Sequence, residues 1–291
     1  MAAQLISVVV PTYNRAEKLA GCLAGLMAQT YPNFEVIVVD DGGTDDTAGV
    51  VKREFPTANY LRQEHAGPAA ARNQGIAAAR GEVVAFTDDD CLPPPGWLAR
   101  LADGFARYPE AAGVGGRLLA PEHVRESNLL ARYEAYLDRL PKGARALEAL
   151  GGNESRAGGT HNIAYRKQTL VNIGGFDQSF PYAAGEDADL KRRITQAGGR
   201  LLFIPFTMLH NRDYTWPAFR RQQFSRGKGR VYFDRKWRRP RTFLAAGLSL
   251  PRALLRLATS PPADRAFIRP AIERAWYLML GQWAGIRELR R

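Results

Sequence analysis

Residues 5–15, Leu-Ile-Ser-Val-Val-Val-Pro-Thr-Tyr-Asn-Arg, join an unbroken apolar run to an abrupt polar end. An apolar run without alternation is typical of a strand that is covered on both faces, as in a parallel sheet. A helix pattern follows from about Arg15 to Ala28, with Leu19, Leu23 and Leu26 on one face. A strand followed by a helix in this way predicts the start of a βαβ unit.

The alternation continues through the first hundred residues. We predict a helix that Thr44 caps and that runs to Phe55, an alanine-rich helix over Gly67–Ala79, and strands over Phe34–Val39 and Glu82–Phe86. Alternating strands and helices predict an α/β protein with a mainly parallel central sheet flanked by helices.

The later part of the chain is less regular. Further elements are expected at Gly113–Leu119 (strand), Asn128–Leu140 (helix), His161–Tyr165 (strand), Asp187–Ala197 (helix) and Leu201–Ile204 (strand). Paired glycines at 151–152 and 158–159 predict a flexible loop. We expect one α/β domain over residues 1–215 and a basic helical extension over 216–291.

Composition narrows the class of protein. The 291 residues are 45% hydrophobic and 10% aromatic, which is typical of a folded globular chain. The first residues lack a basic segment, so they do not predict a signal peptide. Two cysteines, Cys22 and Cys91, offer no disulfide framework and indicate a reducing compartment.

The net charge of +12 is unevenly distributed. Residues 1–210 carry 22 Lys and Arg against 24 Asp and Glu, whereas residues 211–291 carry 19 against 5. A pI near 10 suggests a nucleic-acid-binding protein, but such proteins spread basic residues over a folded binding face. Because the predicted α/β body is slightly acidic, we expect no nucleic-acid partner.

Three adjacent carboxylates, Asp88-Asp89-Asp90, directly follow the apolar segment 83–86. Neighbouring carboxylates at the end of a buried strand repel one another, and one takes up a proton unless a cation lies nearby. Carboxylate oxygens are ligands that suit Mg²⁺ or Mn²⁺. The alternative is an acidic turn that water solvates.

Two other predicted strands also end in polar residues, namely Pro11-Thr12-Tyr13-Asn14 and Asp40-Asp41. Ligands of doubly wound sheets bind at the carboxyl ends of the strands, so we expect these ends to form one crevice. The first strand lacks the Gly-x-Gly that a nicotinamide or flavin enzyme needs. Carboxylates with a metal ion suit a diphosphate ligand.

Glu186-Asp187 opens a predicted helix after Gly185. A helix N-terminus favours the ionised carboxylate, so a general base there would be charged near neutral pH. The alternative is simple capping of the helix.

Six segments together resemble the family-two glycosyltransferases of the GT-A fold. They cover roughly residues 5–210 in the family's order: Ser7–Arg15, Val38–Asp46, Ala71–Ile76, Phe86–Asp90, Gly174–Asp177 and Gly185–Asp187. The resemblance implies an inverting, divalent-metal-dependent enzyme that moves one sugar from a nucleotide-diphosphate sugar to an acceptor hydroxyl. It places the nucleotide-binding half at about residues 1–100 and the acceptor and catalytic half at 101–215.

The resemblance also implies roles for single residues. Asp187 would be the general base, supported by Glu186, and Asp90 with His210 would bind the metal. His161 lies where relatives shape the donor-sugar or acceptor pocket. The donor nucleotide and diphosphate would contact Pro11, Thr12, Asn14, Asp40, Arg72, Asp88 and Asp89.

Two departures limit what the resemblance implies. The Gln-x-x-Arg-Trp motif of processive polysaccharide synthases is absent, with only a loose match at 222–226, so we expect transfer of a single sugar. A nucleotidyltransferase shares the sheet and the metal, but the glycine-rich basic loop that it carries after the first strand is also absent. An intact set of Asp88, Asp90 and Asp187 argues against an inactive relative.

The basic extension mixes arginine with leucine, tryptophan and phenylalanine. None of its apolar stretches reaches the roughly 18 residues of a membrane-spanning helix. The mixture predicts helices that lie in a membrane interface and attract anionic headgroups. The alternative is that the extension forms a packed helical cap on the rest of the protein. A weaker hypothesis is that Arg226–Arg230 helps to hold a diphosphate.

We expect a cytoplasmic enzyme at the inner face of the cell membrane, with a lipid-linked or cell-surface glycan acceptor.

Overall fold

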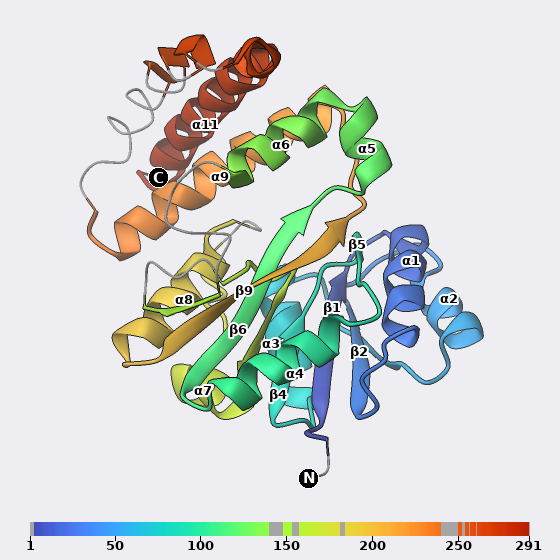
Figure 1. Cartoon of the computed structure of the whole chain (residues 1–291). Coiled ribbons are helices and arrows are strands. Elements are labelled where there is room, and N and C mark those ends of the chain that lie inside the picture. The colour runs from blue at the N-terminus through green and yellow to red at the C-terminus, as the bar shows by residue number, and fades with distance from the viewer. Residues whose placement is uncertain are drawn as a thin grey trace. The chain divides into compact units, whose positions relative to one another are not determined.

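The computed structural model describes residues 3–139, 148–152, 157–180, 184–239, 250–251, 254–255, 257–259 and 261–290. The chain divides into two compact units (Figure 1). The sheet unit comprises Met1–Leu119, Pro141–Gln178 and Asp187–Arg212. The helical unit comprises Ala120–Leu140, Ser179–Glu186 and Asp213–Arg291. The helical unit therefore takes in two stretches that precede the expected extension.

One sheet organises the sheet unit, and its spatial order is β3-β2-β1-β4-β8-β6-β9-β5, with β7 paired to β9. The strands β3, β2, β1 and β4 are all parallel, as the alternating pattern predicts. Beyond β4 the sheet is mixed, because β8 runs antiparallel to both β4 and β6. The strands are β1 (Ile6–Thr12), β2 (Phe34–Asp40), β3 (Asn59–Arg62), β4 (Val83–Phe86), β5 (Cys91–Leu92), β6 (Ala111–Leu119), β7 (Ala149–Gly151), β8 (Ile163–Arg166) and β9 (Arg200–His210).

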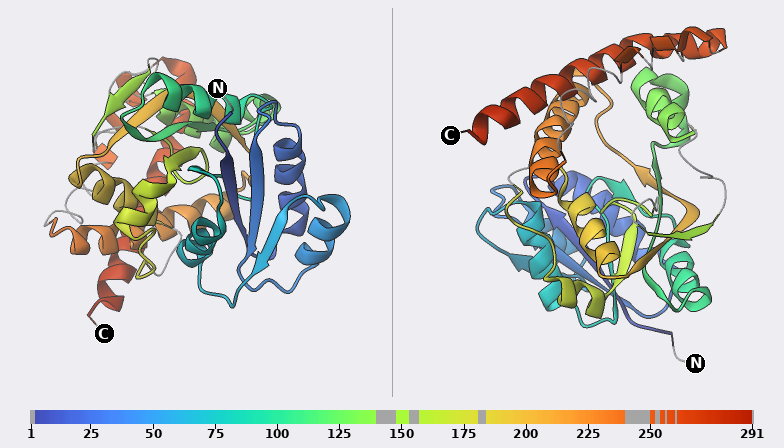
Figure 2. Two further views of the ribbon diagram at one scale, coloured as in Figure 1. Left: turned by 90° about the horizontal axis from the view of Figure 1, so that it is seen from below. Right: turned by 90° about the vertical axis from the view of Figure 1, so that its left-hand side faces the viewer.

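Helices cover both faces of this sheet (Figure 2). Alternate residues of β1 enter different cores, since Val8 and Val10 pack in one cluster and Val9 in the other. The α/β class with a helix-flanked sheet is thereby confirmed. The helices are α1 (Ala16–Met27), α2 (Thr47–Glu54), α3 (Pro68–Ala78), α4 (Trp97–Arg107), α7 (Lys167–Ile173) and α8 (Glu186–Gln196).

The register of the parallel strands aligns their polar ends. Thr12 of β1 lies opposite Asp40 of β2, and Val9 lies opposite Phe86, the last residue of β4. The backbone N–H of Asp41 donates to the carbonyl of Thr12 at 2.9 Å. The three strand ends therefore lie along one edge of the sheet, where the sequence predicts a crevice.

Some local predictions are wrong. Thr44 does not cap α2, which begins three residues later at Thr47, because the side chain of Asp45 accepts bonds from Thr47. Strand β9 extends to His210, where the sequence predicts an end at Ile204, since residues 207–210 pair again with β6 and β5 after a shift in register. Residues 153–156 of the expected glycine loop and Leu140 lie outside the described residues.

Buried hydrogen bonds of the Asn162 side chain connect α4 to the sheet. The indole Nε1 of Trp97 donates to the Asn162 carboxamide oxygen at 2.9 Å, and both side chains are fully buried. The Asn162 Nδ2 donates to the carbonyl of Arg117 at 2.7 Å. One side chain thus satisfies groups from a helix and a strand that are distant in sequence.

We expect Asn162→Ala to lower the free energy of unfolding by about 3 kcal/mol, because a buried indole donor and a buried carbonyl lose their partners. Chemical denaturation of the full-length protein measures this change. Asn172→Ala is the matched control, since Asn172 is exposed on α7, and should cost no more than about 0.5 kcal/mol. Equal stability of the two variants would contradict the assignment.

The helical unit is built around α9 and α11, which lie side by side (Figure 1). Gly227 and Gly281 allow this close approach, because a Cβ at either one would collide with backbone of the opposite helix. None of the helices in the described part of the chain is long and apolar enough to cross a membrane. The elements are α5 (Glu122–Ser127), α6 (Leu129–Arg139), α9 (Trp216–Lys236), the 3₁₀ helix η1 (Pro262–Phe267) and α11 (Ile268–Glu288).

Candidate active site

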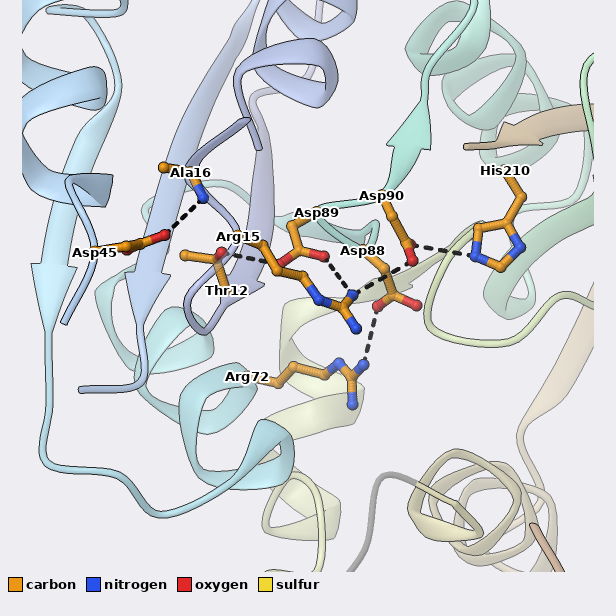
Figure 3. Close-up of polar contacts among 9 residues, drawn as sticks. All are labelled: Thr12, Arg15, Ala16, Asp45, Arg72, Asp88, Asp89, Asp90 and His210. Atoms are coloured by element: carbon orange, nitrogen blue, oxygen red, sulfur yellow. Dashed lines mark hydrogen bonds and ion pairs between the residues drawn. The ribbon is translucent and has the colours of Figure 1, made fainter. Parts of the chain in front are cut away.

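The acidic triplet lies in a cluster with cationic partners from other segments (Figure 3). Asp88 Oδ1 accepts a bond from Nη2 of Arg72, a buried residue of α3, at 3.0 Å. Asp89 accepts bonds from Thr12 Oγ1 at 2.9 Å and from Arg15 Nη1 at 3.1 Å. The chain's own arginines therefore neutralise part of the charge that predicts a bound cation. Arg15 has no assigned role in the sequence-based site.

Asp90 and His210 meet although 120 positions separate them in the chain. The Asp90 Oδ1 lies 3.2 Å from the His210 Nε2. Pairing of Cys91 with His210 in β5 and β9 holds the two segments together, and Asn211 N–H donates to the Asp90 carbonyl at 2.7 Å. The two side chains predicted to bind metal are thus neighbours.

The surroundings move the pKa values of Asp89 and Asp90 in opposite directions. Burial raises the pKa of Asp89 to about 6, and the charge of Asp90 adds to this against the lowering by Arg15. Burial also disfavours the Asp90 anion, but the hydrogen bond and charge of His210 outweigh it and lower the Asp90 pKa to about 2. Asp90 is the carboxylate of this pair that stays ionised under all ordinary conditions.

The side chains near Asp90 are compatible with a divalent cation that takes some of its ligands from the protein and the others from a diphosphate. Within the described residues, no group of three or more His, Cys, Asp and Glu side chains is arranged as a complete protein site. Asp90 and His210 offer one oxygen and one nitrogen donor, and Asp88 lies in the same cluster. Mg²⁺ sites commonly take few protein ligands and complete their coordination with phosphate oxygens and water.

The polar ends of β1 and β2 form an interlocked turn. The Asn14 backbone has φ 53°, a left-handed conformation that asparagine tolerates. Its side-chain oxygen accepts bonds from the backbone N–H groups of Thr44 at 2.6 Å and Asp45 at 3.2 Å. Pro11 is buried in β1 opposite Val39. These two predicted donor-binding residues shape the turn.

Asp40 is 2% exposed, and both of its oxygens already accept bonds within the chain. Oδ1 accepts from the Gly43 N–H at 2.8 Å, and Oδ2 accepts from the Tyr60 hydroxyl at 2.7 Å. A Cβ on Gly43 would lie 2.9 Å from Asp40 Oδ1, so the position needs glycine. The structure gives Asp40 a role in ordering the turn, and its contact with a base stays a prediction.

An exposed aromatic pair lies beside this turn. The rings of Tyr13 and His65 stack with centroids 4.3 Å apart, and Tyr13 is 44% exposed. The His65 Nδ1 lies 2.9 Å from Asp41 Oδ2, which anchors the imidazole. Sequence reasoning missed the pair, because 52 positions separate two residues that only the fold brings together.

Asp187 lies in the first turn of α8, after Gly185 with φ 104°. Its Oδ1 accepts a bond from the Ala188 N–H at 2.7 Å. Glu186, the first residue of α8, is buried. Asp189, two positions further, is fully buried and pairs with Arg193 at 2.8 Å, which gives it a structural role.

His161 is half buried and lies close enough to both Asp88 and Asp187 for their charges to act on its pKa. Burial lowers the His161 pKa to about 4, although the charges of Asp88 and Asp187 act in the opposite direction. The imidazole is therefore neutral at neutral pH. Lys191 of α8 donates to the carbonyls of Ala157 and Gly158, both at 3.1 Å, and so holds the loop that carries His161.

Gly159 leaves just enough room for His161 and Asp187. A Cβ at Gly159 would lie 2.7 Å from His161 Cε1 and 3.1 Å from Asp187 Oδ2.

We expect Gly159→Ala to displace one of these side chains and to lower turnover about 10- to 100-fold with an unchanged fold, since small misplacements of reacting groups are costly. Turnover and the thermal midpoint of the full-length variant measure this. Gly96→Ala is the control, because its Cβ would meet nothing within 4 Å; equal turnover of both variants would remove Gly159 from the site.

The helix-flanked mixed sheet, with its acidic cluster at the carboxyl end of β4, has the architecture of the GT-A glycosyltransferases. A model of Glycosyl transferase family 2 matches residues 7–173, more than half of the chain. The chain belongs to glycosyltransferase family 2, as its six motifs indicate.

Curated relatives agree with this assignment. The pre-mycofactocin glycosyltransferase of Mycobacterium tuberculosis is 34% identical over 210 residues, which are 70% of this chain and 42% of the relative. Glycosyltransferase AglE of Haloferax volcanii is 29% identical over 237 residues, which are 78% of this chain and 73% of the relative. This chain thus spans less than half the length of the mycobacterial relative.

Solved structures show the same fold. The mannosyltransferase PcManGT from Pyrobaculum calidifontis, in complex with GDP-Man and Mn²⁺, has a TM-score of 0.66 at 22% identity over 98% of this chain and 88% of its own. Residues 1–349 of Staphylococcus aureus TarS, in complex with UDP, have a TM-score of 0.58 at 17% identity over 98% of this chain and 91% of their own.

Proposed function

We propose that this glycosyltransferase moves a single sugar from a nucleotide-diphosphate sugar to an acceptor hydroxyl, with inversion and with a divalent cation. The observation that carries the proposal is the meeting of Asp90 with His210 beside Asp88, at the carboxyl end of β4. The Mn²⁺ and GDP-Man bound by a protein of the same fold support this choice of ligands.

The donor would lie along the carboxyl ends of β1, β2 and β4. The open face of Tyr13 would stack on the base, and the turn at Asn14 and Asp40 would bound the nucleotide. Thr12 and Arg15 hold Asp89, and Arg72 holds Asp88, so the triplet is oriented before any ligand arrives. Such preorganisation removes a cost that binding would otherwise include.

Asp90 and His210 would hold Mg²⁺ or Mn²⁺, and the cation would supply positive charge to stabilise the departing nucleoside diphosphate. Asp187 would accept the proton of the acceptor hydroxyl as that oxygen attacks the anomeric carbon, with Glu186 as support. The neutral His161 would face the sugar or the acceptor. A single displacement needs no nucleophile from the protein.

The basic extension supports an inference about the acceptor and the place of action. We infer a lipid-linked or cell-surface glycan acceptor and a peripheral position at the inner face of the membrane, with residues 216–291 toward anionic lipid. Absence of a processive motif supports the transfer of one sugar per acceptor.

A thermal-shift screen of the full-length protein with UDP-, GDP- and dTDP-sugars, each with and without Mn²⁺, identifies the donor. A donor that binds the folded state raises the unfolding midpoint. Product analysis then separates the two candidate activities. Nucleoside diphosphate released with sugar transferred supports a glycosyltransferase, whereas pyrophosphate would indicate a nucleotidyltransferase and contradict the proposal.

A further inference from the structure

Helix α11 carries an apolar stripe that faces solvent. Four of the eight large apolar side chains exposed in the described residues belong to this helix: Ile268, Ile272, Trp276 and Trp283. Their spacing of four, four and seven residues places them on one face. Both tryptophans are more than half exposed, at 54% and 52%. Exposed tryptophans in one row mark a contact surface.

The other side of α11 is already occupied. Ala271, Ala275 and Gly285 are buried, and Gly281 lies against the backbone of α9 at Phe224. Both acidic residues of α11 form ion pairs with α9, because Glu273 pairs with Arg220 and Glu288 pairs with Lys228. The apolar stripe therefore has no acidic residue of its own helix available to it.

Basic residues accompany the stripe at both ends. Arg269 is seven positions before Trp276, and Arg287 is four positions after Trp283, so both share the exposed face. The Arg287 guanidinium lies 4.6 Å from the Trp283 ring centroid, and the Arg269 guanidinium lies 4.2 Å from that of Trp216. Tryptophan and arginine on one face, without acids, match the boundary between headgroups and acyl chains of an anionic bilayer.

We propose that this face of α11 docks the enzyme on an anionic lipid surface, with the helix lying along the membrane and Trp276 and Trp283 entering it. The proposal deepens the peripheral membrane contact inferred above but does not depend on sugar transfer. It assigns the contact to α11 alone. Three basic residues of α9 are engaged within the helical unit, since Arg220 and Lys228 pair with acids of α11 and Arg230 pairs with Asp234 at 2.9 Å.

A second copy of the chain is a less suitable occupant. An isologous contact places the same patch on both partners. Here it would set Arg269 and Arg287 of one copy against the arginines of the other, and Glu273, the acid one turn from Arg269, is already paired with Arg220. An anionic bilayer offers the opposite charge and an apolar layer at the depth that tryptophan occupies.

Vesicle flotation of the full-length protein tests the docking without any sugar donor. We expect binding to vesicles of equal parts phosphatidylcholine and phosphatidylglycerol, and little binding to phosphatidylcholine alone. The pair Trp276→Ser and Trp283→Ser should weaken binding at least about tenfold. Arg269→Gln and Arg287→Gln should each weaken it about fivefold. Matched controls are Val171→Ser, exposed on α7, and Lys52→Gln, exposed on α2, which should bind like wild type.

Fluorescence separates membrane entry from a loss of structure. Brominated lipids should quench the wild-type emission in part, leaving the buried Trp97 unaffected. The pair Trp276→Phe and Trp283→Phe should keep vesicle binding, because phenylalanine is apolar, but lose the quenching. Thermal midpoints should stay near that of wild type in all these variants, since the side chains are exposed.

Three outcomes would overturn the proposal. Wild-type protein that does not bind phosphatidylglycerol vesicles removes the lipid partner. Binding that the serine pair retains in full places the contact elsewhere. A dimer in sedimentation without lipid that the serine pair dissociates, with no vesicle binding, assigns the face to a second copy. None of these results bears on donor hydrolysis or transfer, so the proposed activity stands or falls separately.

Discussion

Asp90→Asn is expected to lose about 10²- to 10³-fold in kcat/KM for the sugar donor while the protein remains folded, because it removes the carboxylate charge that lies 3.2 Å from His210 in the proposed metal site. Asparagine has nearly the same size and can still accept a bond from His210 or Arg15. It lacks the negative charge that a divalent cation requires. The cluster should therefore persist with little affinity for metal.

Release of nucleoside diphosphate over a range of Mn²⁺ concentrations measures the effect. The variant should need much more Mn²⁺ than wild type, with its thermal midpoint lowered only slightly. Asp103→Asn is the control, because this half-exposed acid of α4 pairs with Arg107 away from the triplet. The same Mn²⁺ dependence and turnover in Asp90→Asn as in wild type would exclude Asp90 from the site.

Asp187→Asn is expected to bind the donor almost normally and to transfer sugar about 10²- to 10⁴-fold more slowly, the range typical of a lost general base. The side chain should keep its place in the variant, since asparagine can also accept the bond from the Ala188 N–H. The amide cannot, however, take a proton from the acceptor hydroxyl. The loss should therefore fall on kcat rather than on donor affinity.

Asp189→Asn is an informative comparison on the same helix. Its carboxylate is fully buried against Arg193, so the substitution leaves a poorly compensated cation and should cost stability rather than chemistry. We expect Asp187→Asn to keep its midpoint and lose turnover, and Asp189→Asn to show the reverse. Wild-type turnover in Asp187→Asn would disqualify Asp187 as the base.

Local sequence patterns predicted the parts of the fold that depend on burial along one segment. The run at 5–10 has to be covered on both faces, and it forms β1 in the centre of the parallel strands. The sequence did not predict β3 or α4. Residues of β3 are only half buried or exposed, so they show no clear pattern. Helix α4 does carry buried Trp97, Leu98, Leu101 and Phe105 at helical spacing, a signal that sequence reasoning missed. Mixed pairing beyond β4 depends on connections that no periodicity records.

The candidate site likewise contains residues that the sequence predicted and residues that only the structure shows. The triplet and Glu186-Asp187 were visible because their residue types are unusual at a strand end and a helix start. Arg15 and the stacked pair of Tyr13 and His65 were not, since an exposed arginine or aromatic ring in a loop has no local signature. The basic extension was predicted as a whole, but only the packing of α9 against α11 shows which side of α11 stays open.

Calorimetric titration of GDP and UDP into the full-length protein tests the central claim most directly, which is that Asp90 and His210 hold a cation together with a diphosphate. We predict that one of these nucleotides binds when Mn²⁺ is present, that excess chelator abolishes binding, and that added Mn²⁺ restores it. Undiminished affinity under exhaustive chelation would contradict the account.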